Sequence, residues 1–229
     1  AGAVDFLAAH AAGGTGCATV FAVNPEKVMK ARQDPALRAL LASATLLIPD
    51  GIGVVLAARW LGLGRFGRVP GSELMPNLCA RAAERGHAVF LFGARPDVND
   101  EAAAALLRRY PGLRIAGRQH GYVEDGDMPE LIRRINESGA DILFVALGSP
   151  RQEAWMHRHA PALRVKVAQG VGGTFDVVAG RVNRAPPLFL KLNLEWLYRL
   201  LREPRRIWRQ RTLAGFAWCV AKRKILQKG

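Results

Sequence analysis

Short apolar runs alternate with longer stretches that have helical periodicity along the first 180 residues of the chain. The apolar runs are nearly continuous instead of alternating with polar residues, which is typical of strands that are buried on both faces. We predict strands over 18–23, 45–48, 88–92, 113–116, 141–147 and 165–171, and helices over 25–43, 54–61, 71–85, 99–110, 128–138 and 152–159. This order predicts an α/β fold in which helices cover both faces of a parallel sheet.

The composition changes at residues 184–187 (RAPP), and the chain beyond them is strongly basic. Residues 181–229 contain thirteen Lys and Arg but only two Asp and Glu, and therefore carry +11 of the total net charge of +14. We therefore expect an α/β domain over residues 1–187 and a basic, amphipathic helical appendage over residues 188–229. Such an appendage is suited to an anionic membrane surface.

Several broad classes of protein are disfavoured by the sequence. Cys17, Cys79 and Cys219 are odd in number and widely spaced, so we expect no disulfide framework and a reducing compartment. Residues 1–20 lack a basic leader followed by a long apolar run, so we expect no secretory signal peptide. The longest apolar run of the basic segment, 213–221, is far shorter than the about 20 residues that span a bilayer. We expect a cytoplasmic protein.

Polar residues and glycines follow most of the predicted strands. Asn24 comes after the first strand and Asp50 after the second, and glycine-rich segments begin at Gly93, Gly148 and Gly170. Ligands of open α/β sheets bind at the carboxyl ends of the strands, where glycines let backbone N–H groups approach a phosphate. The sequence therefore places its candidate site at this edge of the sheet.

Each of these features alone also has an ordinary structural explanation. Asp50 could cap a turn, and Gln152 could lie in a solvated first turn of a helix. The segment 170–173 lacks the third glycine of a dinucleotide fingerprint, so we expect no nicotinamide cofactor. His157 and His159 are two residues apart and point in different directions on a helix, so we expect no metal site there.

Taken together, the motifs occur in a specific order. They are Asn24, 50–53 (DGIG), 68–71 (RVPG), 148–153 (GSPRQE), 170–176 (GVGGTFD), 184–186 (RAP) and 195–196 (EW). In this order and spacing they resemble the WecG/TagA/CpsF glycosyltransferases, glycosyltransferase family 26, over residues 20–211. The resemblance implies a Rossmann-like domain that moves a sugar from a UDP-sugar to a sugar on a polyprenyl diphosphate. It further implies inversion, no metal, no cofactor, and a peripheral position on the inner face of the bacterial cytoplasmic membrane.

The resemblance also implies roles for single residues. Asp50 matches the general base that would take the proton of the acceptor hydroxyl. Asn24, Arg68 and Gln152 match residues that bind the sugar substrates. The residues implied for the nucleotide and its diphosphate are Gly172, Gly173, Arg199, Arg206 and Arg209. Guanidinium groups can neutralise a leaving diphosphate in place of a metal.

The donor sugar stays open at this stage. Glucose, N-acetylmannosamine and N-acetylmannosaminuronic acid are the donors associated with the family, whose products are teichoic acid, common antigen or exopolysaccharide. The chain has Ala22 where the family often has Thr, and Gly67 where an acid commonly precedes the arginine. The lost hydroxyl at Ala22 slightly disfavours N-acetylmannosamine.

Alternative functions rest mainly on the basic segment. A sequence pI near 10.8 and interleaved aromatic residues are typical of nucleic-acid-binding proteins, although no recognition motif is present. A non-catalytic nucleotide-binding protein or another small-molecule transferase, such as a methyltransferase, is a further alternative. The segment could pack on its own domain or form a homo-oligomer contact. If it binds a membrane, we expect Trp208, Phe216 and Trp218 at the level of the headgroups.

Overall fold

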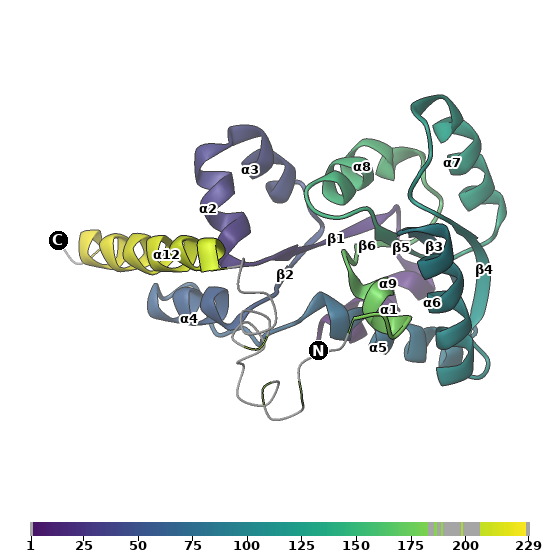
Figure 1. Cartoon of the computed structure of the whole chain (residues 1–229), viewed down its shortest axis with the longest axis horizontal. Coiled ribbons are helices and arrows are strands. Elements are labelled where there is room, and N and C mark those ends of the chain that lie inside the picture. The colour runs from purple at the N-terminus through teal and green to yellow at the C-terminus, as the bar shows by residue number, and fades with distance from the viewer. Residues whose placement is uncertain (1, 183–185, 187–188, 190–197, 199–206, 228–229) are drawn as a thin grey trace. The chain divides into compact units, whose positions relative to one another are not determined.

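A computed structural model describes residues 2–182, 186, 189, 198 and 207–227 of the chain. Its centre is a six-stranded sheet with the strand order β2-β1-β6-β5-β3-β4 (Figure 1). The strands are β1 (Ala18–Val23), β2 (Leu46–Pro49), β3 (Ala88–Gly93), β4 (Arg114–Gln119), β5 (Ile142–Ala146) and β6 (Val167–Gly170). The pairings β1–β6, β6–β5, β5–β3 and β3–β4 are all parallel. The predicted α/β, Rossmann-like fold is confirmed.

Helices cover both faces of this sheet (Figure 1). The helices of the α/β part are α1 (Ala3–Gly13), α2 (Pro25–Gln33), α3 (Pro35–Ala42), α4 (Ile52–Trp60), α5 (Gly71–Arg85), α6 (Pro96–Arg109), α7 (Met128–Glu137), α8 (Arg151–His159) and α9 (Thr174–Val178). Two 3-10 turns, η1 (Asp125–Asp127) and η2 (Ala160–Ala162), precede α7 and follow α8. Helices α1, α5, α6 and α9 contact one another on one face, and α8 lies against β5 and β6 on the other. A basic helix, α12 (Ile207–Leu226), follows near the C-terminus.

The central strands form the core because both of their faces are covered. Every residue of β3 and β5 is buried, as the continuous apolar runs predicted. Asn99 is a buried polar residue at the carboxyl end of β3. Its side-chain Nδ2 donates to the carbonyl oxygens of Gly93 and Gln119, at 2.9 and 3.1 Å, and thereby ties the ends of β3 and β4 to α6.

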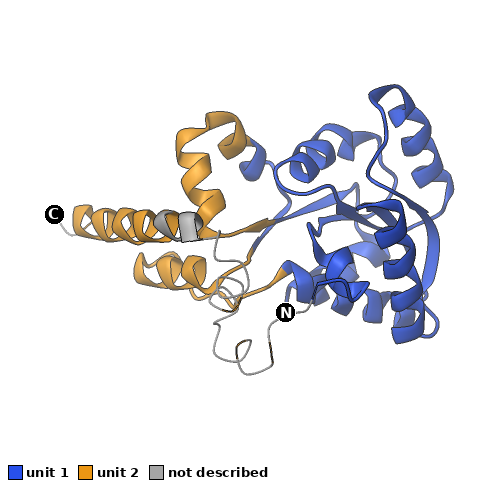
Figure 2. Cartoon of the chain, in the orientation of Figure 1, with its two compact units in different colours: residues 1–21, 40–48, 71–182 blue, residues 22–39, 49–70, 183–229 orange. Residues whose placement is uncertain are grey.

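The chain forms two compact units (Figure 2). Unit 1 consists of Ala1–Phe21, Leu40–Ile48 and Gly71–Val182 and contains most of the sheet. Unit 2 consists of Ala22–Ala39, Pro49–Pro70 and Asn183–Gly229. The basic C-terminal segment is thus grouped with two segments from the first seventy residues. The boundary between residues 187 and 188 that the composition indicates stays a prediction.

The helices of the structure differ from the predicted ones in several places. The single helix expected over 25–43 is two helices, because Asp34 is extended before Pro35 and its Oδ1 accepts a hydrogen bond from the Leu37 N–H at 3.0 Å. The helices Ala3–Gly13 and Thr174–Val178 have no counterpart among the predicted elements. None of the helices within the described residues is both long and apolar enough to cross a bilayer.

Candidate active site

Three of the predicted site residues lie on adjacent backbone segments of unit 2. The Asp50 N–H donates to the Val23 carbonyl oxygen at 2.8 Å, so Asp50 lies beside the end of β1, where Asn24 follows. The Val69 N–H donates to the Pro49 carbonyl oxygen at 3.0 Å, which places the segment with Arg68 on the other side. The side chains of Asn24, Asp50 and Arg68 are all half-buried and therefore reachable from solvent. The structure brings these three residues together.

Asn24 also has a structural role that the sequence did not reveal. It is the N-cap residue of α2, and its Oδ1 accepts a hydrogen bond from the Lys27 N–H at 2.8 Å. The Lys27 Nζ donates to the Ala22 carbonyl oxygen at 2.6 Å, so a buried cation lies beside this turn. Since Oδ1 is used in capping, the Nδ2 amide is the part of Asn24 that can donate to a ligand.

Asp50 is not the cap of the helix that follows it. The N-cap residue of α4 is Gly51, whose φ of 130° and ψ of 136° are open to glycine but strained for other residues. At Gly53, an added Cβ would lie 3.0 Å from Pro25 Cγ. The two glycines of the 50–53 motif therefore allow α4 to start close against the Asn24 turn, with Asp50 at the junction.

Helix α12 packs beside this junction within unit 2. It contacts α2 and α4, and the Phe216 ring lies 4.0 Å from where a Cβ at Gly53 would be. Phe216 is only 9% exposed, so the expectation that it reaches the membrane headgroups is wrong; it is a packing residue. Trp218, in contrast, is exposed. The Arg32 guanidinium contacts the Cys219 sulfur on the packed side of α12.

The predicted arginines of the basic segment cannot be placed at this site. Arg199 and Arg206 lie outside the described residues. Arg209 lies in the first turn of α12, but its side chain and that of Trp208 are also outside the described part.

A second group of predicted residues comes together in unit 1. Gln152, at the start of α8, is buried, and its Oε1 accepts a hydrogen bond from the Gly172 N–H at 3.0 Å. Its Nε2 donates to Glu153 Oε1 at 3.3 Å. A Cβ at Gly170 would lie 2.7 Å from Gln152 Nε2, so glycine is required there for Gln152 to reach the loop. Gly173 follows directly as the N-cap residue of α9.

Two expectations about this group need correction or addition. The alternative that Gln152 and Glu153 lie in a solvated turn is wrong, since they are 4% and 0% exposed. Sequence reasoning also missed Gln169, which is fully buried on the central strand β6. Within the described part of the chain, neither side-chain atom of the Gln169 amide has a hydrogen-bond partner. Its signal in the sequence was a polar residue inside an otherwise apolar strand.

The two histidines of α8 make separate contacts. His157 Nδ1 lies 2.9 Å from Ser43 Oγ, whereas the His159 ring packs on Trp155 with 5.1 Å between ring centroids. Burial, followed by the charge of Arg158, lowers the pKa of His159, which is therefore neutral at pH 7. Among the residues that the structure describes, no cluster of three His, Cys, Asp or Glu side chains is arranged to hold a metal.

Two hollows in unit 1 are lined by other residues. One, of about 610 Å³, lies between α7 and α8 and is lined mainly by apolar side chains, including Met128 and Ile132. The other, of about 360 Å³, lies at the ends of β3 and β4, beside Asn99 and His120. None of the predicted site residues that the structure describes lines either hollow.

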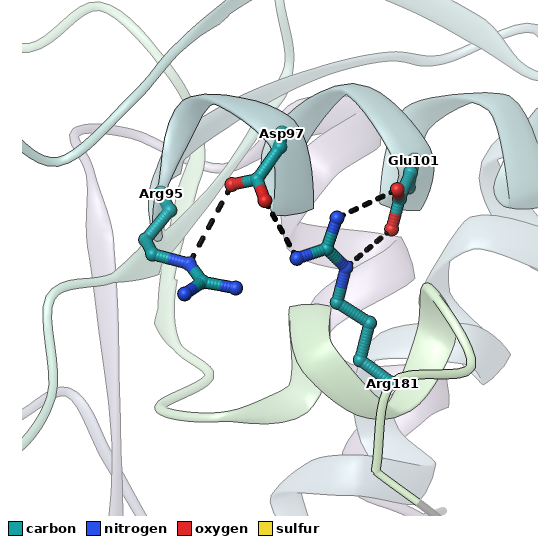
Figure 3. A network of polar contacts seen from close by, with 4 residues as sticks. All are labelled: Arg95, Asp97, Glu101 and Arg181. Carbon is teal, nitrogen blue, oxygen red and sulfur yellow. Dashed lines mark hydrogen bonds and ion pairs between the residues drawn. The ribbon is translucent and has the colours of Figure 1, made fainter.

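An ion-pair cluster fastens the C-terminal end of unit 1 to α6 (Figure 3). Arg181 donates from Nε and Nη2 to both carboxylate oxygens of Glu101, at 2.6 and 2.7 Å, and from Nη1 to Asp97 Oδ2 at 2.6 Å. The hydrogen bond from Arg181 lowers the pKa of Glu101. Partial desolvation raises the pKa of Asp97, but the hydrogen bond and charge of Arg181, helped by Arg95, outweigh it and lower that pKa. The cluster fixes the point at which the chain leaves unit 1.

Comparison with known proteins identifies the family. The model of the glycosyl transferase WecG/TagA/CpsF family matches residues 1–229. The chain is 40% identical over 193 residues to the N-acetylglucosaminyldiphosphoundecaprenol N-acetyl-beta-D-mannosaminyltransferase of Bacillus spizizenii strain W23, a match that covers 84% of this chain and 74% of the relative. The chain therefore belongs to the WecG/TagA/CpsF family, as its motifs predicted, and is a glycosyltransferase. This result favours the enzyme over the nucleic-acid-binding and non-catalytic alternatives.

Proposed function

We propose that this glycosyltransferase moves N-acetylmannosamine from UDP to the N-acetylglucosamine of a polyprenyl-diphosphate-linked acceptor. The observation that carries the proposal is the 40% identity, across 84% of the chain, to a relative whose name states that sugar and that acceptor. The product would enter a cell-surface polysaccharide such as teichoic acid, exopolysaccharide or common antigen. Ala22 weakly disfavours N-acetylmannosamine, but the sequence identity to this relative outweighs that single position.

Asp50 is the general base in this proposal. Its carboxylate is half-buried at the start of α4, and its backbone is fixed by the hydrogen bond to Val23. A base must be held within hydrogen-bond reach of the acceptor hydroxyl, and a rigid junction of strand and helix can hold it there. The hydroxyl oxygen attacks the anomeric carbon opposite the nucleotide, Asp50 takes the proton, and UDP leaves. Inversion of an α-linked UDP-sugar gives the β linkage named for the relative.

Asn24 and Arg68 act as substrate-binding neighbours of this base. The Nδ2 group of Asn24 can donate to a sugar hydroxyl while its Oδ1 continues to cap α2. Arg68 lies on the segment that pairs with Pro49 and supplies a cation beside the base. The placement of the three residues on adjacent segments supports this assignment.

The glycine loop of unit 1 is the proposed nucleotide-binding element. The Gly172 N–H already donates to Gln152, so Gly172 contributes to the shape of the loop. The backbone N–H of Gly173 is the one that we assign to the nucleotide. We assign Gln152 to holding this loop as well as to the substrates. Arg199, Arg206 and Arg209 would neutralise the leaving diphosphate, which makes a metal unnecessary. The basic C-terminal segment would hold the enzyme on the inner face of the cytoplasmic membrane.

The test of the base is the variant Asp50→Asn. It keeps the size of the side chain and removes its basicity, so we expect turnover to fall by about 10²–10⁴-fold while UDP binding is retained. Asp34→Asn is the matched control, because Asn retains the capping of α3 that Asp34 provides in the same unit. The assay measures release of UDP and formation of the lipid-linked disaccharide. Turnover by Asp50→Asn equal to that of the control would exclude Asp50 as the base.

The donor and the metal requirement are tested with the same assay. UDP-N-acetylmannosamine, UDP-N-acetylmannosaminuronic acid and UDP-glucose are offered in turn, with and without EDTA. We expect the first to react fastest and EDTA to have no effect. A clear preference for another donor would overturn the donor assignment, and loss of turnover in EDTA would overturn the role of the arginines as replacements for a metal.

A further inference from the structure

An exposed apolar stripe runs along α4 and the segment that follows it. Leu56, Trp60, Leu63 and Phe66 are between 53% and 65% exposed. They follow one another at intervals of three or four residues, and Leu56 and Trp60 therefore share one face of α4. Single exposed apolar residues are ordinary. Four large ones within eleven residues form an apolar patch, which is typical of a site that contacts another molecule or a membrane.

Helix α12 presents a similar face beside α4. Trp218 and Ile225 are about 70% exposed, whereas Phe216 and Val220 are buried against the rest of unit 2. Helices α4 and α12 contact each other and lie side by side in Figure 1. Both helices belong to unit 2, so their exposed apolar residues are carried on one compact body.

The charged residues of these two segments are all basic. Neither 51–70 nor 207–229 contains an Asp or Glu. Arg59 and Arg65 are exposed next to the α4 stripe, and Lys222 and Arg223 are exposed on α12. Apolar and aromatic side chains flanked by cations, without any acid, are the composition of segments that lie in the interface of an anionic bilayer.

We infer that α4, residues 61–66 and the exposed face of α12 form one surface that inserts into an anionic lipid bilayer, here called the bilayer face. The basic residues of the C-terminal segment alone would only attract the protein to the surface of an anionic bilayer. The four apolar side chains of the α4 stripe would in addition insert into the bilayer. The inference that this face binds lipid rests on the exposed apolar side chains and the basic residues beside them. Its link to the acceptor rests on the proposed function.

The position of Asp50 gives the bilayer face a role in that function. Asp50 immediately precedes the N-cap of α4, and a helix rises 1.5 Å per residue, so Leu56 lies about 10 Å along the helix from Asp50. An acceptor hydroxyl on a lipid-linked sugar is separated from the lipid by a diphosphate and part of a sugar ring. Because the stripe runs along the side of α4, insertion would lay this helix along the membrane surface and keep the base near the headgroups, where that hydroxyl lies.

The experiment measures partition of the full chain onto vesicles of phosphatidylcholine and phosphatidylglycerol. Trp60→Ser, Leu63→Ser and Phe66→Ser are compared singly and together, with Leu107→Ser as the matched control, since Leu107 is 48% exposed on α6 of unit 1. We expect each single variant to weaken partition about tenfold, equal to about 1.4 kcal/mol, the triple variant by more than 100-fold, and the control by less than twofold. The effect should persist at high salt, because insertion of apolar groups is not screened.

Two further measurements separate the possible outcomes. Brominated lipids should quench the fluorescence of the wild type more than that of Trp60→Phe, because Trp60 lies among the acyl chains. The triple variant should lose turnover of an acceptor embedded in vesicles and keep turnover of a short-chain acceptor in solution. If the wild type turns over neither acceptor, the proposed function fails while the vesicle result still decides the bilayer face.

Either of two results would overturn the inference. One is partition of the triple variant equal to that of the control. The other is a change in oligomeric state of the triple variant in lipid-free solution, with partition unchanged, which would assign the stripe to a contact between two copies of the chain.

Discussion

The hydrogen bond between Gln152 and the glycine loop leads to a prediction that separates two roles for this residue. If Gln152 contacts only the sugars, as the resemblance implied, its removal should leave binding of UDP alone unchanged. If it holds the loop through the Gly172 N–H, as the contact at 3.0 Å indicates, its removal should weaken binding of UDP itself. The informative variant is Gln152→Met, which keeps the length of the side chain and loses the acceptor.

The magnitude follows from what each variant leaves behind. A buried N–H without an acceptor costs about 1–3 kcal/mol, and the partly buried position of the Gly172 N–H favours the lower half of that range. We therefore expect Gln152→Met to lower the free energy of unfolding by about 1–2 kcal/mol. Gln152→Ala removes buried volume as well, and should lose about 1 kcal/mol more. If the free loop must be ordered again by the ligand, the Kd of UDP rises by roughly 5–30-fold.

The assays are denaturant unfolding and calorimetric titration with UDP. Gln33→Met is the control, since Gln33 is an exposed residue at the end of α2 and its replacement tests the chemical change without the contact. The order of stability should be wild type and control, then Gln152→Met, then Gln152→Ala. A Gln152→Met protein that binds UDP as tightly as the control would refute the loop-holding role and return Gln152 to the sugars alone.

Two further predictions concern the backbone and the ion pairs. Gly51→Ala should lower the free energy of unfolding by about 1–3 kcal/mol, because Gly51 has a φ of 130°. Gly67→Ala is the control and should change it by less than about 0.5 kcal/mol, since a Cβ at Gly67 would lie in open space. Equal losses of the two variants in denaturant unfolding would contradict this prediction. Arg181→Gln should destabilise unit 1 at neutral pH. The pKa values of Asp97 and Glu101 are lowered in the folded state, so the stabilisation is complete above their ordinary values of 3.8 and 4.5 and is lost as the pH falls through the folded values. Thermal midpoints of wild type and variant should therefore converge in acid; a constant difference would mean that Arg181 acts through packing.

The sheet could be predicted because burial on both faces leaves a direct trace in the sequence. The residues of β3 and β5 are apolar or glycine at every position. This pattern is typical of a strand that is covered on both faces. Helix ends were less certain. The division at Asp34 and Pro35 had a local signal in the proline and the capping residue, but the apolar spacing continues across it and suggested one helix.

Two side chains are buried that sequence reasoning had expected near solvent or a membrane, and both depend on contacts between distant segments. Gln152 is polar and begins a helix, which suggests solvent, yet it is buried because Gly170 leaves room for its side chain. Phe216 lies in a basic segment, which suggested a membrane position, yet it packs beside Gly53. In both cases the space for the side chain is left by a glycine more than fifteen residues away in the sequence. The local pattern of polar and apolar residues therefore could not predict the burial.

The packing of α12 changes how a truncation of the basic segment must be interpreted. Removing residues from about 188 onward would take away the arginines proposed for the diphosphate and part of the bilayer face, but it would also remove Phe216 and Val220 from the body of unit 2. The apolar surface of α2 and α4 beside the Asp50 junction would then be exposed to water. Loss of activity in such a protein would follow from any of these causes. Only substitutions of single side chains, at Arg209 for the diphosphate, Trp60 for the membrane and Phe216 for packing, assign the effect to one of them.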